Sequence, residues 1–132
     1  MNAKISQCVT ELQSSDSAVR AAAAERLCLL ESEAQAAAVD LARAVVDPSE
    51  EVVEFAVAAL ESVGPPRAAD VDELIGLLGN GEPDVAYWAA TLLGRLGGEA
   101  ATAATALASA AENHAADHVR QRAAWAVKKI KG

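Results

Sequence analysis

Apolar residues recur along this chain in a pattern that repeats every 33 or 34 positions. Four similar segments open at Val19, Val52, Val85 and Val119, and in each of them further apolar residues follow the valine at spacings of four, eight and eleven. Those spacings place the side chains on one side of an α-helix. The aligned residues are Ala23, Ala56, Ala89 and Ala123, then Leu27, Leu60, Leu93 and Val127, then Leu30, Val63, Leu96 and Ile130.

A second apolar set precedes each of these segments and follows the i, i+3, i+4, i+7 rule of a helix. Its members are Ile5, Cys8, Val9 and Leu12; Ala38, Leu41, Ala42 and Val45; Val71, Leu74, Ile75 and Leu78; and Ala104, Leu107, Ala108 and Ala111. Each unit therefore predicts a helix, a turn and a second helix. We expect Gly64 and Gly97 to end second helices, and the prolines fall in predicted connectors.

A fixed offset between similar helical hairpins is typical of stacked repeats, whose neighbours bury one another's apolar faces. We predict an all-α solenoid of four hairpins, at approximately residues 1–31, 32–64, 65–98 and 99–132. Together they form a single domain over residues 1–132. Alanine, which accounts for 33 of the 132 residues, favours closely packed helices rather than a β-sheet.

The segments DSAVRAAAAERLCLL and DHVRQRAAWAVKKI resemble the short HEAT-like repeat named after phycobilisome lyases. The resemblance implies a right-handed superhelix whose second helices line a concave recognition face. It also implies an aspartate and an arginine that link successive repeats. Asp16 and Arg20 match that pair, and the fourth repeat keeps Arg120 with Asp117 one place out of register.

The outer face of each second helix is predicted at the second, sixth and ninth residues after the valine. From these positions we select a contact set for a partner protein: Tyr87, Trp125, Thr91, Glu54, Glu61, Gln121 and Lys128. Tyrosine and tryptophan are frequent anchors at interfaces. Gly94 leaves a bare position beside Trp125, which indicates either a shallow binding slot or simple packing of the indole over the glycine.

The chain is acidic, with 11 Lys and Arg against 19 Asp and Glu, which disfavours a general nucleic-acid binder. The last fourteen residues are the exception, because they hold five basic residues and no acidic ones. These cations either complement the dipole of the last helix or meet an anionic partner surface. The chain shows neither a signal peptide nor an apolar run that could span a membrane, so we expect a cytoplasmic protein.

Catalytic motifs are missing, and we expect no enzyme activity, no cofactor and no metal site. His114 and His118 are spaced for one helical turn, but Asp117 beside them is better explained as a turn or helix-capping residue. We predict a scaffold that binds an unidentified protein, as a monomer or weak homodimer. The alternatives are a lyase-like or chaperone-like subunit for a tetrapyrrole, implied by the resemblance alone, and a structural array without a dedicated ligand.

Overall fold

A computed structural model describes residues 2–132, and every regular element in that range is helical. The α-helices form four consecutive pairs: α1 (Ala3–Glu11) with α2 (Ser17–Leu30), α3 (Ala38–Ala44) with α4 (Glu50–Val63), α5 (Val71–Leu78) with α6 (Pro83–Leu96), and α7 (Ala104–Asn113) with α8 (Asp117–Lys131). Short 3-10 helices, η1 (Glu31–Ala37), η2 (Ala68–Asp70) and η3 (Gly97–Ala103), lead into α3, α5 and α7. The predicted all-α class is confirmed.

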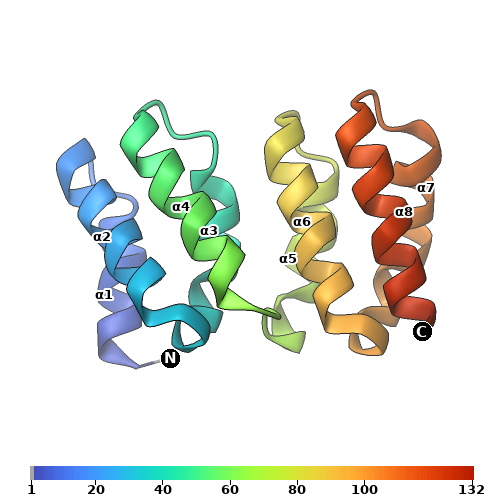
Figure 1. Ribbon diagram of the computed structural model, residues 1–132, viewed down its shortest axis with the longest axis horizontal. Helices are drawn as coiled ribbons and strands as arrows, with labels where there is room; N and C mark the ends of the chain where they lie inside the picture. The colour runs from blue at the N-terminus through green and yellow to red at the C-terminus, as the bar shows by residue number, and fades with distance from the viewer. Residues whose placement is uncertain (1) are drawn as a thin grey trace. The chain divides into compact units, whose positions relative to one another are not determined.

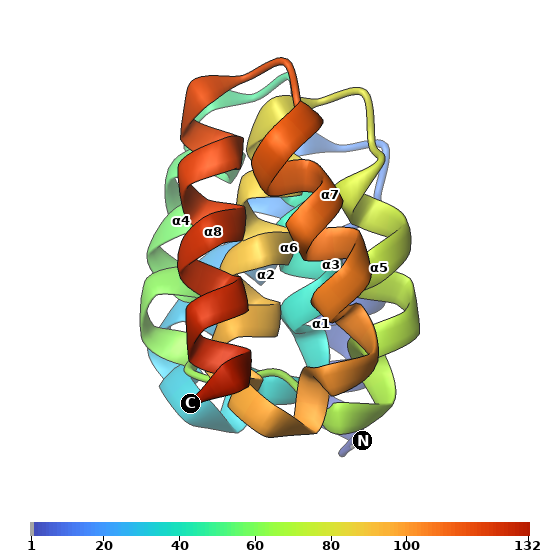
Figure 2. The same ribbon diagram turned by 90° about the vertical axis from the view of Figure 1, so that its right-hand side faces the viewer.

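Packing divides the chain into two compact units, one ending at Gly64 and the other spanning Pro65–Gly132. In the first unit α2 packs against α4, and in the second α6 packs against α8 (Figure 1). The second helices of consecutive hairpins therefore lie side by side within each unit. Figure 2 shows α7 and α8 as an antiparallel pair, with α6 behind α8. A single domain over residues 1–132 stays a prediction.

The core of each unit consists of small and branched apolar side chains at the predicted positions. The four aligned alanines Ala23, Ala56, Ala89 and Ala123 are fully buried. Alanine lets neighbouring helices approach closely, and larger residues such as Leu60 fill the remaining space. Ala108 is the exception on the predicted stripes, because it is exposed on α7, which packs against α5 and α8 through its other side.

One polar residue fixes the turn inside every hairpin. In each case its side chain accepts a hydrogen bond from the main-chain N–H two residues further on, as in Asx and Ser/Thr turns. The four residues and their donors are Ser14 with Asp16, Asp47 with Ser49, Asn80 with Glu82, and His114 with Ala116. Because four different residue types fill this position, the shared turn conformation could not be recognised from residue identity.

The second helices also end alike. Gly64 and Gly97 cap α4 and α6 with φ of 76° and 60°, which confirms their predicted role. The equivalent position after α2 is Glu31, whose φ is 51°. A left-handed backbone is strained at a residue with a Cβ. The end of α2 is therefore less favourable than the glycine-capped ends of α4 and α6.

Arg20 links the first two hairpins. Its Nε donates to Oδ2 of Asp47 over 2.8 Å, and its Nη1 donates to the carbonyl oxygen of Ser14 over 2.8 Å. The carboxylate partner of this arginine therefore lies in the turn between α3 and α4 of the second hairpin. Asp16, which the family resemblance implies as the linking carboxylate, instead accepts from the N–H of Ala18 and caps α2.

Candidate functional site

The seven predicted contact residues lie on α4, α6 and α8, but not all of them are at the surface. The exposed ones are Glu54 and Glu61 on α4 and Gln121 and Lys128 on α8, and the half-buried ones are Tyr87 on α6 and Trp125 on α8. Tyr87, Gln121 and Trp125 line one pocket in the second unit. Glu54 and Glu61 belong to the first unit and form no part of it.

Thr91 is the prediction that the structure contradicts. This residue is only 5% exposed, and its hydroxyl donates to the carbonyl oxygen of Tyr87 over 2.9 Å. The cause is lateral packing, because α8 lies along this side of α6 and covers positions that an isolated helix would present to solvent. Ala21 is buried for the same reason where α4 packs against α2. Thr91 is therefore not available to a partner.

Gly94 permits close contact between α6 and α8. A Cβ at this position would overlap with the indole of Trp125 and would lie 3.1 Å from Cα of Ala126. The packing interpretation of Gly94 is therefore the observed one, and no slot is open above it. Trp125 rests on the glycine with one part of its ring and still lines the neighbouring pocket.

This pocket, which we call the aromatic pocket, has a volume of about 370 Å³. It is lined by Tyr87, His118, Gln121, Arg122 and Trp125. Tyr87 comes from α6 and the other four residues come from α8, so the side-by-side packing of two second helices creates it. Two aromatic side chains and one arginine thus meet at an open site.

Arg122 contacts both aromatic rings of the pocket. Its Cζ is 5.0 Å from the ring centroid of Tyr87 and 4.7 Å from that of Trp125, within the range of cation–π attraction. Its Nη2 donates to the hydroxyl of Tyr87 over 2.8 Å. The aromatic rings and the guanidinium therefore hold one another in place before any ligand arrives.

The two histidines are engaged separately. Nε2 of His118 lies 3.1 Å from Oδ1 of Asp84 at the edge of the aromatic pocket, whereas Nδ1 of His114 accepts the turn hydrogen bond from Ala116. Within residues 2–132, no group of three or more His, Cys, Asp or Glu side chains is arranged to hold a metal ion. The side chains that line the aromatic pocket offer aromatic, cationic, imidazole and amide groups.

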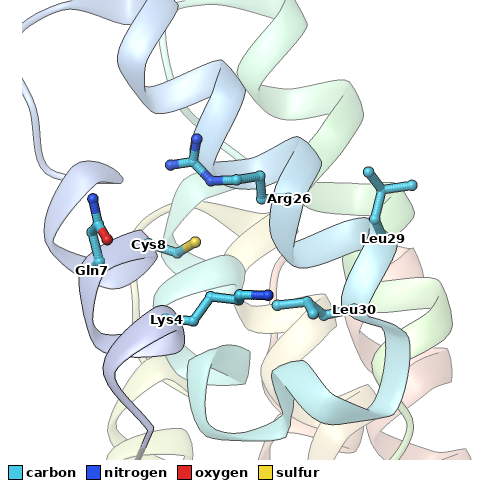
Figure 3. A pocket seen from close by; sticks show the side chains of 6 residues that line it. All are labelled: Lys4, Gln7, Cys8, Arg26, Leu29 and Leu30. Atoms are coloured by element: carbon cyan, nitrogen blue, oxygen red, sulfur yellow. The ribbon is translucent and has the colours of Figure 1, made fainter.

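A second pocket of about 440 Å³ lies between α1 and α2, and we call it the N-terminal pocket. It is lined by Lys4, Gln7, Cys8, Arg26, Leu29 and Leu30, and Figure 3 shows the Lys4 side chain extending toward Leu30. Cys8 is buried, Arg26 pairs with Glu11, and Leu29 is 76% exposed. The pocket is larger than the aromatic pocket but contains no aromatic anchor.

Two residues of the aromatic pocket were missing from the predicted contact set. Arg122 occupies the position that holds Phe55 and Trp88 in the two preceding repeats, and from the sequence it was considered only as one of the five cations of the last fourteen residues. His118 lies one residue before the valine that opens the repeat. The available signal was that Arg122 aligns with Phe55 and Trp88. A position that holds large side chains in two repeats is expected to face a neighbouring helix, which is where Arg122 meets Tyr87.

Comparison with known families decides which family this fold represents. The family described as HEAT repeats matches residues 47–128, more than half of the chain. The chain belongs to the HEAT repeat family. The predicted HEAT-like identity is thereby confirmed, whereas the phycobilisome-lyase detail stays a prediction. A comparison with curated proteins finds no match.

Solved structures share the fold of this HEAT repeat chain. An engineered protein matches with a TM-score of 0.59 at 20% identity, over 98% of this chain and 63% of the other. A designed armadillo repeat protein, in complex with the peptide (KR)4, matches with a TM-score of 0.61 at 21% identity, over 96% of this chain and 64% of the other. This chain thus spans less than two thirds of either structure, and at such identities the likeness shows the fold alone.

Proposed function

We propose that this HEAT repeat chain is a non-enzymatic protein-interaction module that binds a peptide segment of a partner at the aromatic pocket. The observation that carries the proposal is the group formed by Tyr87, Arg122 and Trp125, which the packing of α6 against α8 preorganises at an open surface. Tyrosine, tryptophan and arginine are the residue types that most often dominate binding energy at protein interfaces.

The half-burial of the two aromatic residues supports this use. Tyr87 and Trp125 are packed firmly enough to lose little conformational entropy on binding, yet both retain accessible surface at the pocket. The exposed amide of Gln121 can form hydrogen bonds with a main chain laid across the pocket. Lys128 is exposed on the same helix and would belong to the polar rim.

The fold is consistent with this proposal. A helical-repeat protein of the same fold, the designed armadillo protein, is in complex with a peptide. Glu54 and Glu61 stay proposed contact residues for a separate surface on α4, because both are exposed there. The proposed state of the chain as a monomer or weak homodimer stays a prediction. So does the tetrapyrrole-handling alternative, to which neither pocket adds support.

A displayed library of random peptides, selected against the intact chain, tests the proposal. We expect peptides to be enriched and their affinity to fall at least tenfold when Tyr87→Ala and Trp125→Ala are combined, because the anchors are removed. Circular dichroism and a thermal melt establish that this variant is folded. Gln121→Ala removes only the exposed amide of the pocket, so it should weaken the same peptides without changing the melt.

Ala124→Ser provides a matched control, because Ala124 is exposed on α8 and does not line the pocket. It should bind the selected peptides like the unmodified chain. The proposal is wrong if no peptide is enriched, or if the selected peptides bind the Tyr87 and Trp125 double variant and Gln121→Ala with unchanged affinity.

A further inference from the structure

We infer that the aromatic pocket is a receptor for a carboxylate, so that the peptide it binds is acidic. The inference rests on the proposed function and names the chemistry of the partner. Its starting point is the guanidinium of Arg122, which is half-buried and contacts two aromatic rings. Across the described residues, no carboxylate forms an ion pair with Arg122.

Other arginines of the chain are paired differently. Arg20 pairs with Asp47, Arg26 with Glu11, Arg67 with Asp70, and Arg120 with Asp117. Arg122 uses one of its five N–H groups on the neutral hydroxyl of Tyr87. Its charge is therefore attracted by aromatic rings but not neutralised, and further N–H groups are available to an incoming acceptor.

The geometry suits a carboxylate in particular. A guanidinium offers its N–H groups in a planar fork that matches the two oxygens of a carboxylate, and such paired hydrogen bonds are among the strongest in proteins. The rings of Tyr87 and Trp125 cover part of the guanidinium and restrict its motion, so less entropy is lost when the acid binds. The amide of Gln121 adds a further donor to the same pocket.

The charges around the pocket favour the same partner. Nζ of Lys129 lies 5.8 Å from the ring centroid of Trp125, and Lys128 is exposed next to it on α8. The acidic group at the edge of the pocket is Asp84, which is engaged with His118. A segment with several Asp or Glu residues can therefore place one carboxylate on Arg122 and its neighbours close to the lysines.

Titration calorimetry with blocked octapeptides tests the inference on the intact chain. The probes are Ac-(Glu-Ala)4-NH2, its neutral counterpart Ac-(Gln-Ala)4-NH2 and the basic Ac-(Lys-Ala)4-NH2. We expect the acidic peptide to bind at least tenfold more tightly than either of the others. Its affinity should fall as salt is raised, because dissolved ions screen the attraction between the peptide's carboxylates and the cations of an open pocket.

Substitutions on α8 locate the effect. Arg122→Gln should weaken the acidic peptide at least tenfold, whereas Lys131→Gln, which removes the same charge from the exposed end of the helix, should change its affinity less than threefold. Arg122→Lys keeps the charge but not the planar fork, so its affinity should lie between those of the unmodified chain and Arg122→Gln. Melting curves of all three variants confirm that each is folded.

The outcomes separate this inference from the proposed function. If selected neutral or basic peptides bind and depend on Tyr87 and Trp125, the interaction module stands and the carboxylate receptor is wrong. If Arg122→Gln has no larger effect than Lys131→Gln, the assignment of Arg122 is wrong. Tighter binding of a ten-residue thymidine oligonucleotide than of the acidic peptide would also overturn the inference, and binding of no peptide at all would overturn both proposals.

Discussion

Gly94 lies on α6 directly against the indole of Trp125. A glycine inside a helix costs about 1 kcal/mol of stability relative to alanine, so its position there needs a compensating gain. The gain is the close approach of α6 and α8, which places Trp125 and Arg122 beside Tyr87. One hydrogen atom in place of a methyl group therefore determines whether the aromatic pocket can form.

Gly94→Ala should lower the free energy of unfolding by about 1–3 kcal/mol, because its methyl group must displace a packed ring or the backbone at Ala126. Urea denaturation measures the change, and the tryptophan fluorescence spectrum should shift as Trp125 moves. Gly76→Ala is the matched control. Gly76 is exposed within α5, and a methyl group there would meet no neighbouring atom within 4 Å, so alanine should raise stability by about 1 kcal/mol.

At the scale of helices, packing and an ion pair between Arg20 and Asp47 join the hairpins of the first unit. Both side chains are largely buried, with 15% and 11% of their surfaces exposed. Burial alone would raise the pKa of Asp47, but the hydrogen bonds from Arg20 and from the N–H of Ser49 outweigh it and hold the pKa below its usual value. The carboxylate therefore stabilises the folded state in its charged form.

Asp47→Asn should reduce stability by about 1–3 kcal/mol at pH 7, since it removes a charged hydrogen-bond partner from Arg20. Because the folded pKa lies below the unfolded value of about 3.9, the contribution is present above that value and disappears as the pH falls through the folded pKa. Chemical denaturation at pH 7 and pH 3 should thus show a difference that shrinks on acidification. The exposed Asp72→Asn should change stability by less than about 0.5 kcal/mol at either pH.

The helices themselves could be predicted from the sequence because their apolar stripes recur at a fixed offset. The aligned alanines and the leucines eight residues after the valines point to the hairpin core, and they are buried as expected, whereas Leu30 and Leu96 near the helix ends are half-buried. The lateral contacts between hairpins could not be predicted in the same way. A helical projection treats each helix alone, so it placed Thr91 at the surface, although α8 covers it. It also missed the approach of Arg122 to Tyr87 across two helices.

At the scale of the whole molecule, charge is distributed unevenly. Residues 1–64 hold 4 basic and 11 acidic residues, whereas α8 alone holds 5 basic residues and 1 acidic residue. Four of the five residues that line the aromatic pocket come from this cationic helix, so the proposed acidic partner would be attracted to α8 and repelled by the charge of the first unit. In the described part of the chain, no helix is both long and apolar enough to cross a membrane.

The aromatic pocket and the N-terminal pocket are alternative binding sites that one measurement can distinguish. They lie in different units and are lined by different kinds of side chain. Amide chemical shifts recorded by NMR during titration with a selected peptide distinguish them residue by residue. If the chain binds its partner as proposed, the largest shifts should fall on Tyr87 and on the segment 118–125 of α8. Shifts concentrated on α1 and α2 around Cys8 and Leu29, with α6 and α8 unchanged, would contradict a binding site at the aromatic pocket.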